Sequence, residues 1–523
     1  MTENIEGFLG SFLAKAAQKP DQNFAFFNGD PISFAAIERK SAALATQLNA
    51  LGLKHGDRAA VMMRNSELSL PILFGLARAG IVWVPVNAQQ RGEGLRYILE
   101  HCEPGVVICD PDAHETIRES GAEIPASAFI LTSGEGSLRD IFAQEKASFT
   151  VDLPAASDLF AIMYTSGTTG RPKGVLVTHG MMRLAGEAVR QLTTLRPDDV
   201  FFVWEPLYHI GGAQLIVLPV LEDVTLAMVD RFSASRFWAQ VREYGATHIH
   251  YLGGILQILL KQPESVSDRE HKVRIAWGGG CPKEVWPLFS TRFGVEMREC
   301  YGMTEASSIT TCNDNGTVGA VGKPMPWFTI EILDEAGRPV ADGDKGEIVV
   351  RSSIEGALFQ GYLRNSEATA KALRKGALHT GDSGSFDAEG NLWFHGRLTD
   401  SVRCKGENVS AWEVEHIAGG YPSVEDCAIV GVAAEFGEQD IKLFVKPKYG
   451  CEVDPAALSA WLSSRLAPYQ NPRYIAVIEE FERTPSQRIM KHKLSKELSD
   501  CWDRYEAAIA SNGQPNATAS RTR

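Results

Sequence analysis

The sequence predicts an α/β protein with a large N-terminal domain of parallel and mixed sheets flanked by helices, a β-rich subdomain, and a small α+β C-terminal domain. Three observations carry this prediction. Short apolar strands alternate with amphipathic helices from Asn23 onward, several strand ends run into glycine-rich turns, and the pattern changes to a compact strand–helix region after Arg397. We expect an N-terminal domain at residues 1–397, a C-terminal domain at 398–505 and a disordered tail at 506–523.

The first elements carry their own start and stop signals. Ser33 is placed to cap a helix whose apolar stripe includes Ile37, Leu44 and Leu48, and Gly52 is placed to end it. After this helix, strands alternate with helices, and two further helices are expected to end near Gly80 and His101. The strands expected in this part are Arg58–Met63, Ile81–Val86 and Val106–Cys109.

The middle of the chain continues the alternation after a less regular stretch. Residues 110–159 are expected to form a surface connection. A helix is expected near 181–195, and residues 319–350, with several short strands and turns, predict the β-rich subdomain. The strands expected between the surface connection and the β-rich subdomain are Ala161–Met163, Phe201–Trp204, Thr247–Tyr251 and Val273–Trp277.

The C-terminal region combines three strands with a helix. Asp454-Pro455 is an N-cap followed by proline at the first helical position. The strands expected around this helix are Ala428–Val432, Ile441–Lys446 and Tyr474–Ile478.

Composition excludes several classes of protein. The chain has 523 residues, 44% hydrophobic and 22% charged, with a net charge of −13, which argues against broad nucleic-acid binding but permits a local basic pocket for an anionic substrate. The nine cysteines form no C-x-x-C pairs, so neither a zinc cage nor a disulfide framework is indicated. Without a signal peptide or a membrane span in the sequence, we expect a cytoplasmic protein.

The stretch from Tyr164 to Thr178, YTSGTTGRPKGVLVT, has the composition of a polyphosphate-binding loop. Glycines bring backbone N–H groups close to an anion, hydroxyls add donors and one lysine adds charge. The pattern differs from G-x-x-x-x-G-K-[ST], because Arg171 and Pro172 follow Gly170. Taken alone, such a run also fits a surface turn. The residues proposed to bind the anion are Thr165, Ser166, Gly167, Thr168, Thr169 and Lys173.

Four further segments add chemistry in chain order. Residues 206–212, PLYHIGG, place His209 beside two glycines, and residues 278–282, GGGCP, follow a buried strand, where open parallel sheets bind ligands. Residues 299–306, ECYGMTEA, combine an aromatic ring with Glu305, a hard oxygen ligand suited to Mg²⁺. Residues 379–382, HTGD, offer a carboxylate to sugar hydroxyls. Separately, each of these segments also fits a structural role.

Together and in this order, these motifs resemble the adenylate-forming (ANL) superfamily, which contains acyl-CoA synthetases, the adenylation domains of peptide synthetases, and luciferases. The resemblance covers the chain to about Tyr505 and rests on YTSGTTGRPKG, YGMTEA, TGD and the GR-to-GENVS block. It implies a large domain and a C-terminal lid that rotates between two half-reactions. The block at residues 406–410 resembles the branch of carnitine/crotonobetaine-CoA ligases and medium-chain or aromatic acyl-CoA synthetases.

The resemblance also implies roles for individual residues. Thr304 matches the residue on the α-phosphate, Glu305 the Mg²⁺ ligand, and Asp382 with Arg397 the ribose-binding pair. Glu299 is expected to accept from the adenine amino group, His209 to lie between the acyl pocket and the thiol tunnel, and Thr399 to be the lid hinge. Further nucleotide contacts are expected from Gly279, Gly280, Cys281, Pro282, Cys300, Tyr301, Gly302, Phe394, Gly406, Glu407 and Asn408. The acyl pocket is expected to be lined by His209, Gly211, Gln214, Tyr251, Gly253 and Gly278.

One departure from the family concerns the C-terminal motif, P-R-T-x-x-G-K. Arg488 stands where its lysine is expected, and Gln487 replaces the glycine. Arginine keeps the charge but is planar and bulkier than lysine. We expect Arg488 to support adenylation; Lys491 or Lys493 is the alternative if the loop shifts.

The leading prediction is an acid–thiol ligase that uses ATP, Mg²⁺ and coenzyme A to activate a small-molecule carboxylic acid. No aspartate lies in residues 208–214 to hold an α-amine, which argues against an amino-acid adenylation domain. Two alternatives stay open: transfer of the acyl group to a carrier protein, and a catalytically weak adenylate-binding homologue. Because several family members are homodimers, a homodimer is one expectation for the oligomeric state.

Overall fold

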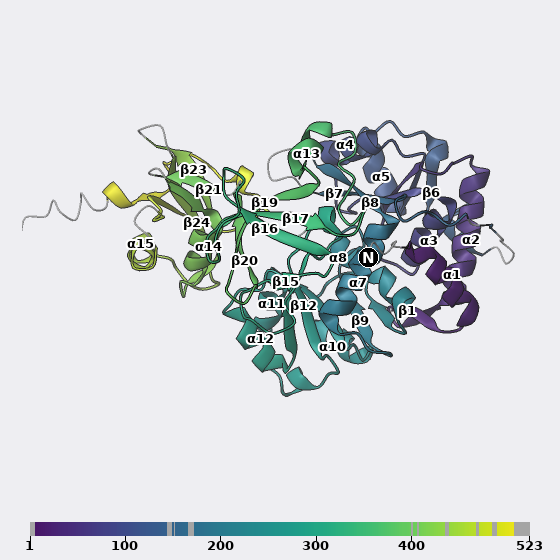
Figure 1. Ribbon diagram of the computed structural model, residues 1–523, viewed down its shortest axis with the longest axis horizontal. Helices are drawn as coiled ribbons and strands as arrows, with labels where there is room; N and C mark the ends of the chain where they lie inside the picture. Colours follow the sequence, from purple (N-terminus) through teal and green to yellow (C-terminus); the bar gives the residue numbers. More distant parts are fainter. Residues whose placement is uncertain are drawn as a thin grey trace, which may run out of the picture.

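The computed structural model describes residues 6–143, 149, 150, 152–165, 172–398, 401–404, 407–434, 439–466, 470–483 and 489–506. Figure 1 shows a large body and, at its left-hand end, a smaller part that contains α14, α15 and β21–β24. Within the described ranges, every helix is too short or too polar to span a bilayer.

The body contains a six-stranded sheet in the order β6-β5-β3-β4-β7-β8, parallel except for β8. One face of this sheet packs on helices α1, α2 and α3, and the other face packs on α4 and α5, as expected for a sheet that is buried on both faces. Its strands are β3 (Arg58–Met62), β4 (Val82–Pro85), β5 (Val106–Cys109), β6 (Phe129–Leu131), β7 (Leu159–Thr165) and β8 (Lys173–Thr178). Its helices are α1 (Phe8–Gln18), α2 (Phe34–Ala50), α3 (Ser69–Ala79), α4 (Gly92–Cys102), α5 (Pro111–Glu119) and α6 (Leu138–Phe142).

Local signals set the ends of these helices. The Ser33 side chain accepts a hydrogen bond of 3.2 Å from Ala36 N at the start of α2. Gly80 ends α3 in a left-handed conformation, with φ +67°. Both predicted boundaries are confirmed.

A seven-stranded sheet, β13-β12-β11-β9-β10-β1-β2, forms the second layer and is parallel except for β2. Helix α7 covers the side that faces the six-stranded sheet, and α10, α11 and α12 cover the other side. The largest hydrophobic core therefore lies between the two sheets. The strands are β1 (Asn23–Phe27), β2 (Asp30–Ser33), β9 (Val200–Val203), β10 (Thr225–Met228), β11 (His248–Leu252), β12 (Ile275–Gly279) and β13 (Glu296–Glu299). The helices are α7 (His179–Thr193), α8 (Ile210–Ala213), α9 (Leu218–Leu221), α10 (Phe237–Glu243), α11 (Gly253–Leu260) and α12 (Val285–Phe293).

The predicted β-rich subdomain is an antiparallel sheet, β16-β17-β19-β18 with β20 beside β19. Its strands are β16 (Phe328–Leu333), β17 (Gly346–Ser352), β18 (Leu373–Arg374), β19 (Ala377–Phe386) and β20 (Leu392–Arg397), with helix α13 (Ser366–Ala372) and the short pair β14 (Thr311–Cys312) and β15 (Lys323–Pro324) nearby.

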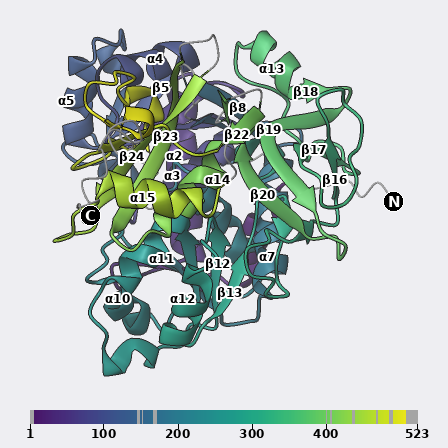
Figure 2. The same ribbon diagram turned by 90° about the vertical axis from the view of Figure 1, so that its left-hand side faces the viewer.

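The C-terminal part has a four-stranded sheet, β23-β24-β25-β26, with α14 and α15 packed on one face. Asp454 caps α15 by accepting from Ala456 N at 2.9 Å, as predicted. In Figure 2 this part lies in front of the body, above α11 and α12 and to the left of β20. Its elements are β21 (Ser401–Cys404), β22 (Glu407–Ser410), α14 (Ala411–Gly419), β23 (Val424–Ala433), β24 (Gln439–Pro447), α15 (Pro455–Ser463), β25 (Tyr474–Val477) and β26 (Trp502–Asp503).

One prediction about the fold is wrong. Residues 110–159 were expected to be a surface connection, but they contain α5, β6 and α6, and β6 extends the six-stranded sheet. Ala113 and Ile117 bury the apolar face of α5 against the sheet. The helix has only these few apolar positions, which is why its periodicity is weak in the sequence.

Candidate active site

The carboxyl ends of β12 and β13 form a turn held by one carboxylate. Strand β12 runs into Gly280, whose φ of +82° favours glycine. The Oε1 atom of Glu299, at the end of β13, accepts from Gly280 N at 2.5 Å and from Cys281 N at 3.0 Å. Cys300 N donates to Gly278 O at 2.7 Å. The adjacent predicted residues 278–282 and 299–302 are therefore brought together at one sheet edge.

Glu299 is buried, with 4% of its surface exposed. Burial raises the pKa of its carboxyl to about 7, and hydrogen bonds from Tyr251, Cys281 and Gly280 act in the opposite direction. Tyr251 donates to Glu299 Oε2 at 2.6 Å. In this structure Glu299 supports the turn; its contact with the adenine amino group stays a prediction.

A second group joins the ECYGMTEA segment to the β-rich subdomain. The Tyr301 hydroxyl donates to Asp382 Oδ2 at 2.7 Å, and Arg397 Nε lies 3.5 Å from Asp382 Oδ1. The ring of Phe394 lies 5.7 Å from that of Tyr301. A Cβ on Gly302 would lie 1.8 Å from Ser308 O, so only glycine fits there. These residues combine aromatic surface with a carboxylate that can accept from sugar hydroxyls.

A third group surrounds Glu305. Tyr362 donates to Glu305 Oε1 at 2.8 Å, and Lys173 Nζ lies 4.6 Å from the centre of the Tyr362 ring. Thr165 Oγ1 donates to Lys173 O at 3.4 Å, which places the entry and exit of the predicted phosphate loop side by side. Thr304, which precedes Glu305, is 7% exposed.

This third group fits a magnesium ion held beside phosphates. Among the described residues, Tyr362 is the only side chain that hydrogen-bonds to Glu305, so its second oxygen is left for a ligand. No cluster of three or more metal-ligating side chains occurs in the part of the chain that the structure describes. Mg²⁺ beside phosphates needs only one or two carboxylates, because water and phosphate oxygens supply its other ligands.

The residues predicted to line the acyl pocket lie in three segments of the seven-stranded layer. His209 begins the turn that leads into α8, and Gln214 Nε2 donates to Gly211 O at 3.1 Å. Tyr251 lies elsewhere: its ring is fully buried on the side of the seven-stranded sheet covered by α10–α12, and its hydroxyl also donates to Arg298 O at 2.8 Å. This position does not favour its predicted contact with an acyl group. Gly253 and Gly278 lie at the start of α11 and in β12.

Several predicted residues lie outside the described residues. These are Ser166, Gly167, Thr168, Thr169, Thr399, Gly406 and Arg488. The backbone of Glu407 and Asn408 belongs to β22, but their side chains are not described. Their roles stay predictions.

One site residue, Tyr362, is not marked by any sequence motif. Tyr362 contacts the site only through the fold, since it lies 57 residues from Glu305.

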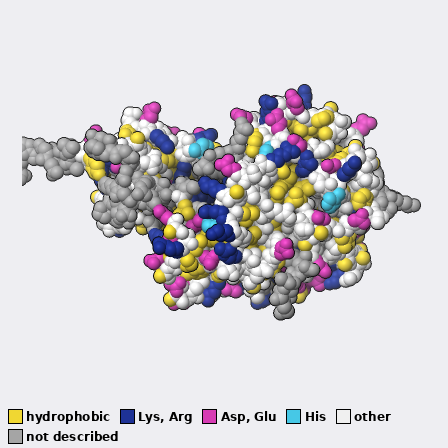
Figure 3. Space-filling model, turned by 45° about the horizontal axis from the view of Figure 1, so that its top comes forward, with side chains coloured by type: hydrophobic (Ala, Val, Ile, Leu, Met, Phe, Trp, Pro, Cys, Tyr) yellow, Lys and Arg dark blue, Asp and Glu magenta, His cyan; other side chains and the backbone are white. Residues whose placement is uncertain are grey.

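The local charge differs from the net charge of −13. In Figure 3, Lys and Arg side chains (dark blue) gather where the smaller part meets the body. Such a local field attracts anionic substrates although the whole chain is acidic.

Sequence comparison assigns the chain to a class of adenylate-forming enzymes. The family described as AMP-binding enzyme matches residues 12–363, and the AMP-binding enzyme C-terminal domain matches residues 413–488. The chain belongs to the AMP-binding enzyme family.

Relatives place it near acyl-CoA synthetases. A crotonobetaine/carnitine–CoA ligase of Salmonella paratyphi A is 31% identical over 481 residues, which is 88% of this chain and 92% of that protein. ATP-bound MatB from Rhodopseudomonas palustris has a TM-score of 0.84 at 28% identity, covering 94% of this chain and 98% of its own. The anthranilate CoA ligase AuaEII, with anthranoyl-AMP, has a TM-score of 0.85 at 21% identity and covers 97% and 98%, which shows a shared fold.

The predicted superfamily, fold class and enzyme type, an AMP-forming acyl-CoA ligase, are therefore confirmed. The particular acid, the acyl acceptor and the residue roles go beyond these comparisons.

Proposed function

We propose that this chain activates a carboxylic acid with ATP and transfers the acyl group to coenzyme A, releasing pyrophosphate and AMP. One observation supports the proposal: within the short ECYGMTEA segment, Tyr301 contacts Asp382, which lies beside Arg397. Four residues further on, Glu305 is joined to Lys173 through Tyr362. A nucleoside triphosphate has both a ribose and a phosphate chain, and these two groups match its two ends.

In the first half-reaction a carboxylate oxygen of the acid bonds to the α-phosphorus of ATP, and pyrophosphate leaves. Asp382 and Arg397 hold the ribose, and the Tyr301 ring lies against the base. Lys173 and the N–H groups of the phosphate loop hold the phosphates as negative charge moves onto the leaving group. Mg²⁺ on Glu305, when bound, neutralises part of that charge.

In the second half-reaction the thiol sulfur of coenzyme A bonds to the acyl carbon, its proton passes to solvent, and AMP leaves. The C-terminal part, for which we keep the predicted bounds 398–505, acts as the lid that excludes water from the mixed anhydride. Thr399 is its proposed hinge, and Arg488 its proposed cation. Loss of Arg488 by substitution with alanine should slow ATP–pyrophosphate exchange.

The test is a panel of carboxylic acids assayed for AMP release with and without coenzyme A. We expect at least one acid to give AMP and an acyl-CoA in equal amounts. If the acyl group forms a thioester with an acyl-carrier protein and not with coenzyme A, the acyl acceptor is the carrier protein. Nucleotide binding without AMP release from any acid would contradict the proposal.

A further inference from the structure

The edge strand β8, which carries the chain out of the predicted phosphate loop, is paired with residues 361–364. Leu363 N donates to Gly174 O at 2.8 Å. Next to this bond, Tyr362 forms an antiparallel bridge with Val175. Residues 361–364 therefore extend the six-stranded sheet at the point where the loop ends.

Strand β7, which leads into the same loop, carries Tyr164 one residue before its end. The Tyr164 hydroxyl lies 2.7 Å from Nδ1 of His101, in the last turn of α4. Burial and the nearby Arg364 guanidinium lower the pKa of His101, so the imidazole is neutral near pH 7 and Nδ1 can accept from the tyrosine. Gly174 pairs with Tyr164 in the ladder, and a Cβ there would lie 3.3 Å from Cζ of the tyrosine, so the glycine leaves room for the ring.

Arg364 connects these two sides of the loop. Its guanidinium forms an ion pair with both oxygens of Glu103, the C-cap of α4, and its Nη1 donates to His101 O at 3.4 Å. Both members of this ion pair are left-handed, with φ +47° at Arg364 and +46° at Glu103. That conformation is unfavourable for a residue with a Cβ and persists only where contacts hold it. We call Tyr164, His101, Glu103 and Arg364 the loop clasp.

The loop clasp is linked to the side chains expected to meet the phosphates. Lys173 faces Thr165 across the β7–β8 ladder, and its Nζ lies 4.6 Å from the centre of the Tyr362 ring. Because Tyr362 lies two residues before Arg364, a shift of the clasp would displace the ring beside Lys173. Donors stabilise a developing charge only when they are already in place, so the position of the loop affects how well it binds phosphates.

We propose that Tyr164, His101 and Arg364 are positioning residues of the adenylation reaction, which hold the predicted phosphate loop so that it binds the β- and γ-phosphates of ATP. The inference rests on the proposed function, because it concerns the triphosphate end of that site. The three residues act through the two strands that flank the loop. A purely structural clasp, which only joins α4 to the β-rich subdomain, would affect stability and would weaken all nucleotides alike.

Isothermal titration calorimetry with α,β-methylene-ATP and with AMP separates these alternatives, because only the first ligand carries β- and γ-phosphates. We expect Tyr164→Phe, which keeps the ring but removes the bond to His101, to raise the Kd for α,β-methylene-ATP about fivefold. Arg364→Met should raise it about tenfold, because it removes a charged partner. The Kd for AMP should stay within about twofold in both variants. Arg338→Met breaks an exposed ion pair with Asp334 in the same subdomain and is the matched control, which should leave both Kd values unchanged.

Turnover supplies a second readout. With an acid that the wild-type enzyme activates, kcat/KM for ATP should fall by the same factors, whereas KM for coenzyme A, which reacts after pyrophosphate has left, should stay within about twofold. If Arg364→Met does not fold, the comparison is made with Tyr164→Phe, which keeps the packing of the ring.

Two outcomes would overturn the inference: equal weakening of AMP and α,β-methylene-ATP, or no weakening of either. Formation of acyl-CoA by the wild-type enzyme would leave the ligase proposal intact in both cases. A selective loss of α,β-methylene-ATP affinity, in a protein that releases AMP from no acid, would support the inference and overturn the ligase proposal alone.

Discussion

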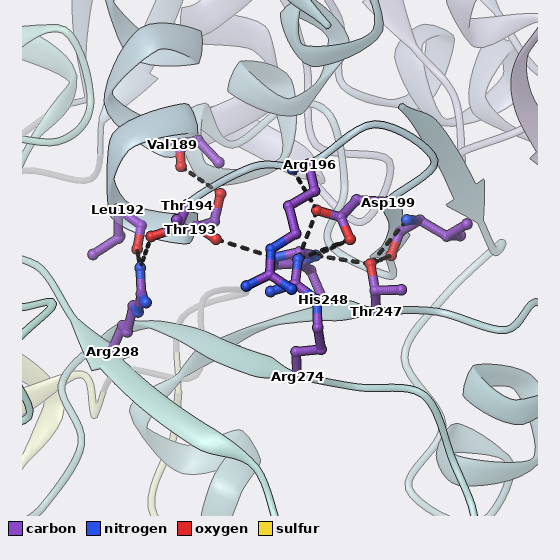
Figure 4. Close-up of polar contacts among 11 residues, drawn as sticks. Val189, Leu192, Thr193, Thr194, Arg196, Asp199, Thr247, His248, Arg274 and Arg298 are labelled. Atoms are coloured by element: carbon purple, nitrogen blue, oxygen red, sulfur yellow. Dashed lines mark hydrogen bonds and ion pairs between the residues drawn. The ribbon is translucent and has the colours of Figure 1, made fainter. Parts of the chain in front are cut away.

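The two ends of the seven-stranded sheet hold buried charges in opposite ways. At the amino ends, Asp199 precedes β9, His248 begins β11 and Arg274 precedes β12 (Figure 4). Arg274 Nη2 lies 2.8 and 2.7 Å from the two oxygens of Asp199. His248 lies 2.9 Å from Thr247 Oγ1 through Nδ1 and 3.2 Å from Thr193 O through Nε2.

At the carboxyl ends the charges are less completely paired. Glu205 keeps a buried oxygen without a well-directed donor, and burial raises the pKa of Glu299 to about 7. The amino ends therefore contribute to stability, whereas the carboxyl ends retain the capacity to bind a ligand, as is usual for open parallel sheets.

The largest expected effect is at the amino ends. Arg274→Met leaves the carboxylate of Asp199, 4% exposed, without its cation, and the free energy of unfolding should fall by about 3 kcal/mol. Urea-induced unfolding measures this change, while kcat/KM of the folded enzyme should stay within about twofold. Arg231→Met, on a side chain that is 78% exposed, is the control and should change stability by less than about 0.5 kcal/mol. If Arg274→Met lost activity but not stability, the amino ends of the sheet would serve the reaction and not the stability of the fold, which would contradict the comparison.

The next effect is at the active site. Glu305→Gln removes the proposed Mg²⁺ ligand and should lower the rate of AMP release about 100-fold, since it removes one group that stabilises developing charge. The melting temperature should change by less than about 2 °C, because the glutamine can still accept from Tyr362. Activity within threefold of wild type at saturating Mg²⁺ would show that Glu305 has no such role.

The pH dependence of stability should differ in sign between the two ends. Burial lowers the pKa of His248 to about 4, so its contribution to stability is complete above about pH 6.5 and is lost as the pH falls toward 4. The raised pKa of Glu299 works the other way, and stability is lost as the pH rises from about 4.5 to 7. His248→Asn should flatten the loss of stability on the acid side, and Glu299→Gln should flatten the loss of stability between pH 4.5 and 7, each by roughly 2 kcal/mol. Urea unfolding across pH 4–8 tests both; profiles unchanged from wild type would contradict the assigned environments.

The smallest effect is expected for Tyr362→Phe. The variant loses the hydrogen bond to Glu305 but keeps the ring beside Lys173. We expect kcat/KM for ATP to fall about tenfold, the usual size for one hydrogen bond to a charged group. Tyr474→Phe, in the C-terminal sheet, is the matched control and should keep wild-type activity.

Much of this fold is specified by local signals. Ser33, Gly80 and Asp454 each end or begin a helix through contacts within a few residues, so the sequence alone predicts them. The pair Asp110-Pro111 carries the same signal as Asp454-Pro455, and it marks the start of α5, within the residues that were expected to be a surface connection.

The site is predicted less completely, because its contacts join distant segments. The motifs identify Glu305 and Asp382, but they give no sign that Tyr362 bridges Glu305 to Lys173. His250 meets Glu205 only because β11 lies beside β9 in the sheet. Such partners follow from strand order, which local patterns do not determine.

The most direct measurement is a crystal structure of the protein with Mg²⁺ and α,β-methylene-ATP, which resists cleavage at the α-phosphate. The account predicts the ribose hydroxyls on Asp382, the base beside Tyr301, and Mg²⁺ between Glu305 and the phosphates. A nucleotide bound at the amino ends of the strands, or anywhere away from Asp382 and Glu305, would contradict it.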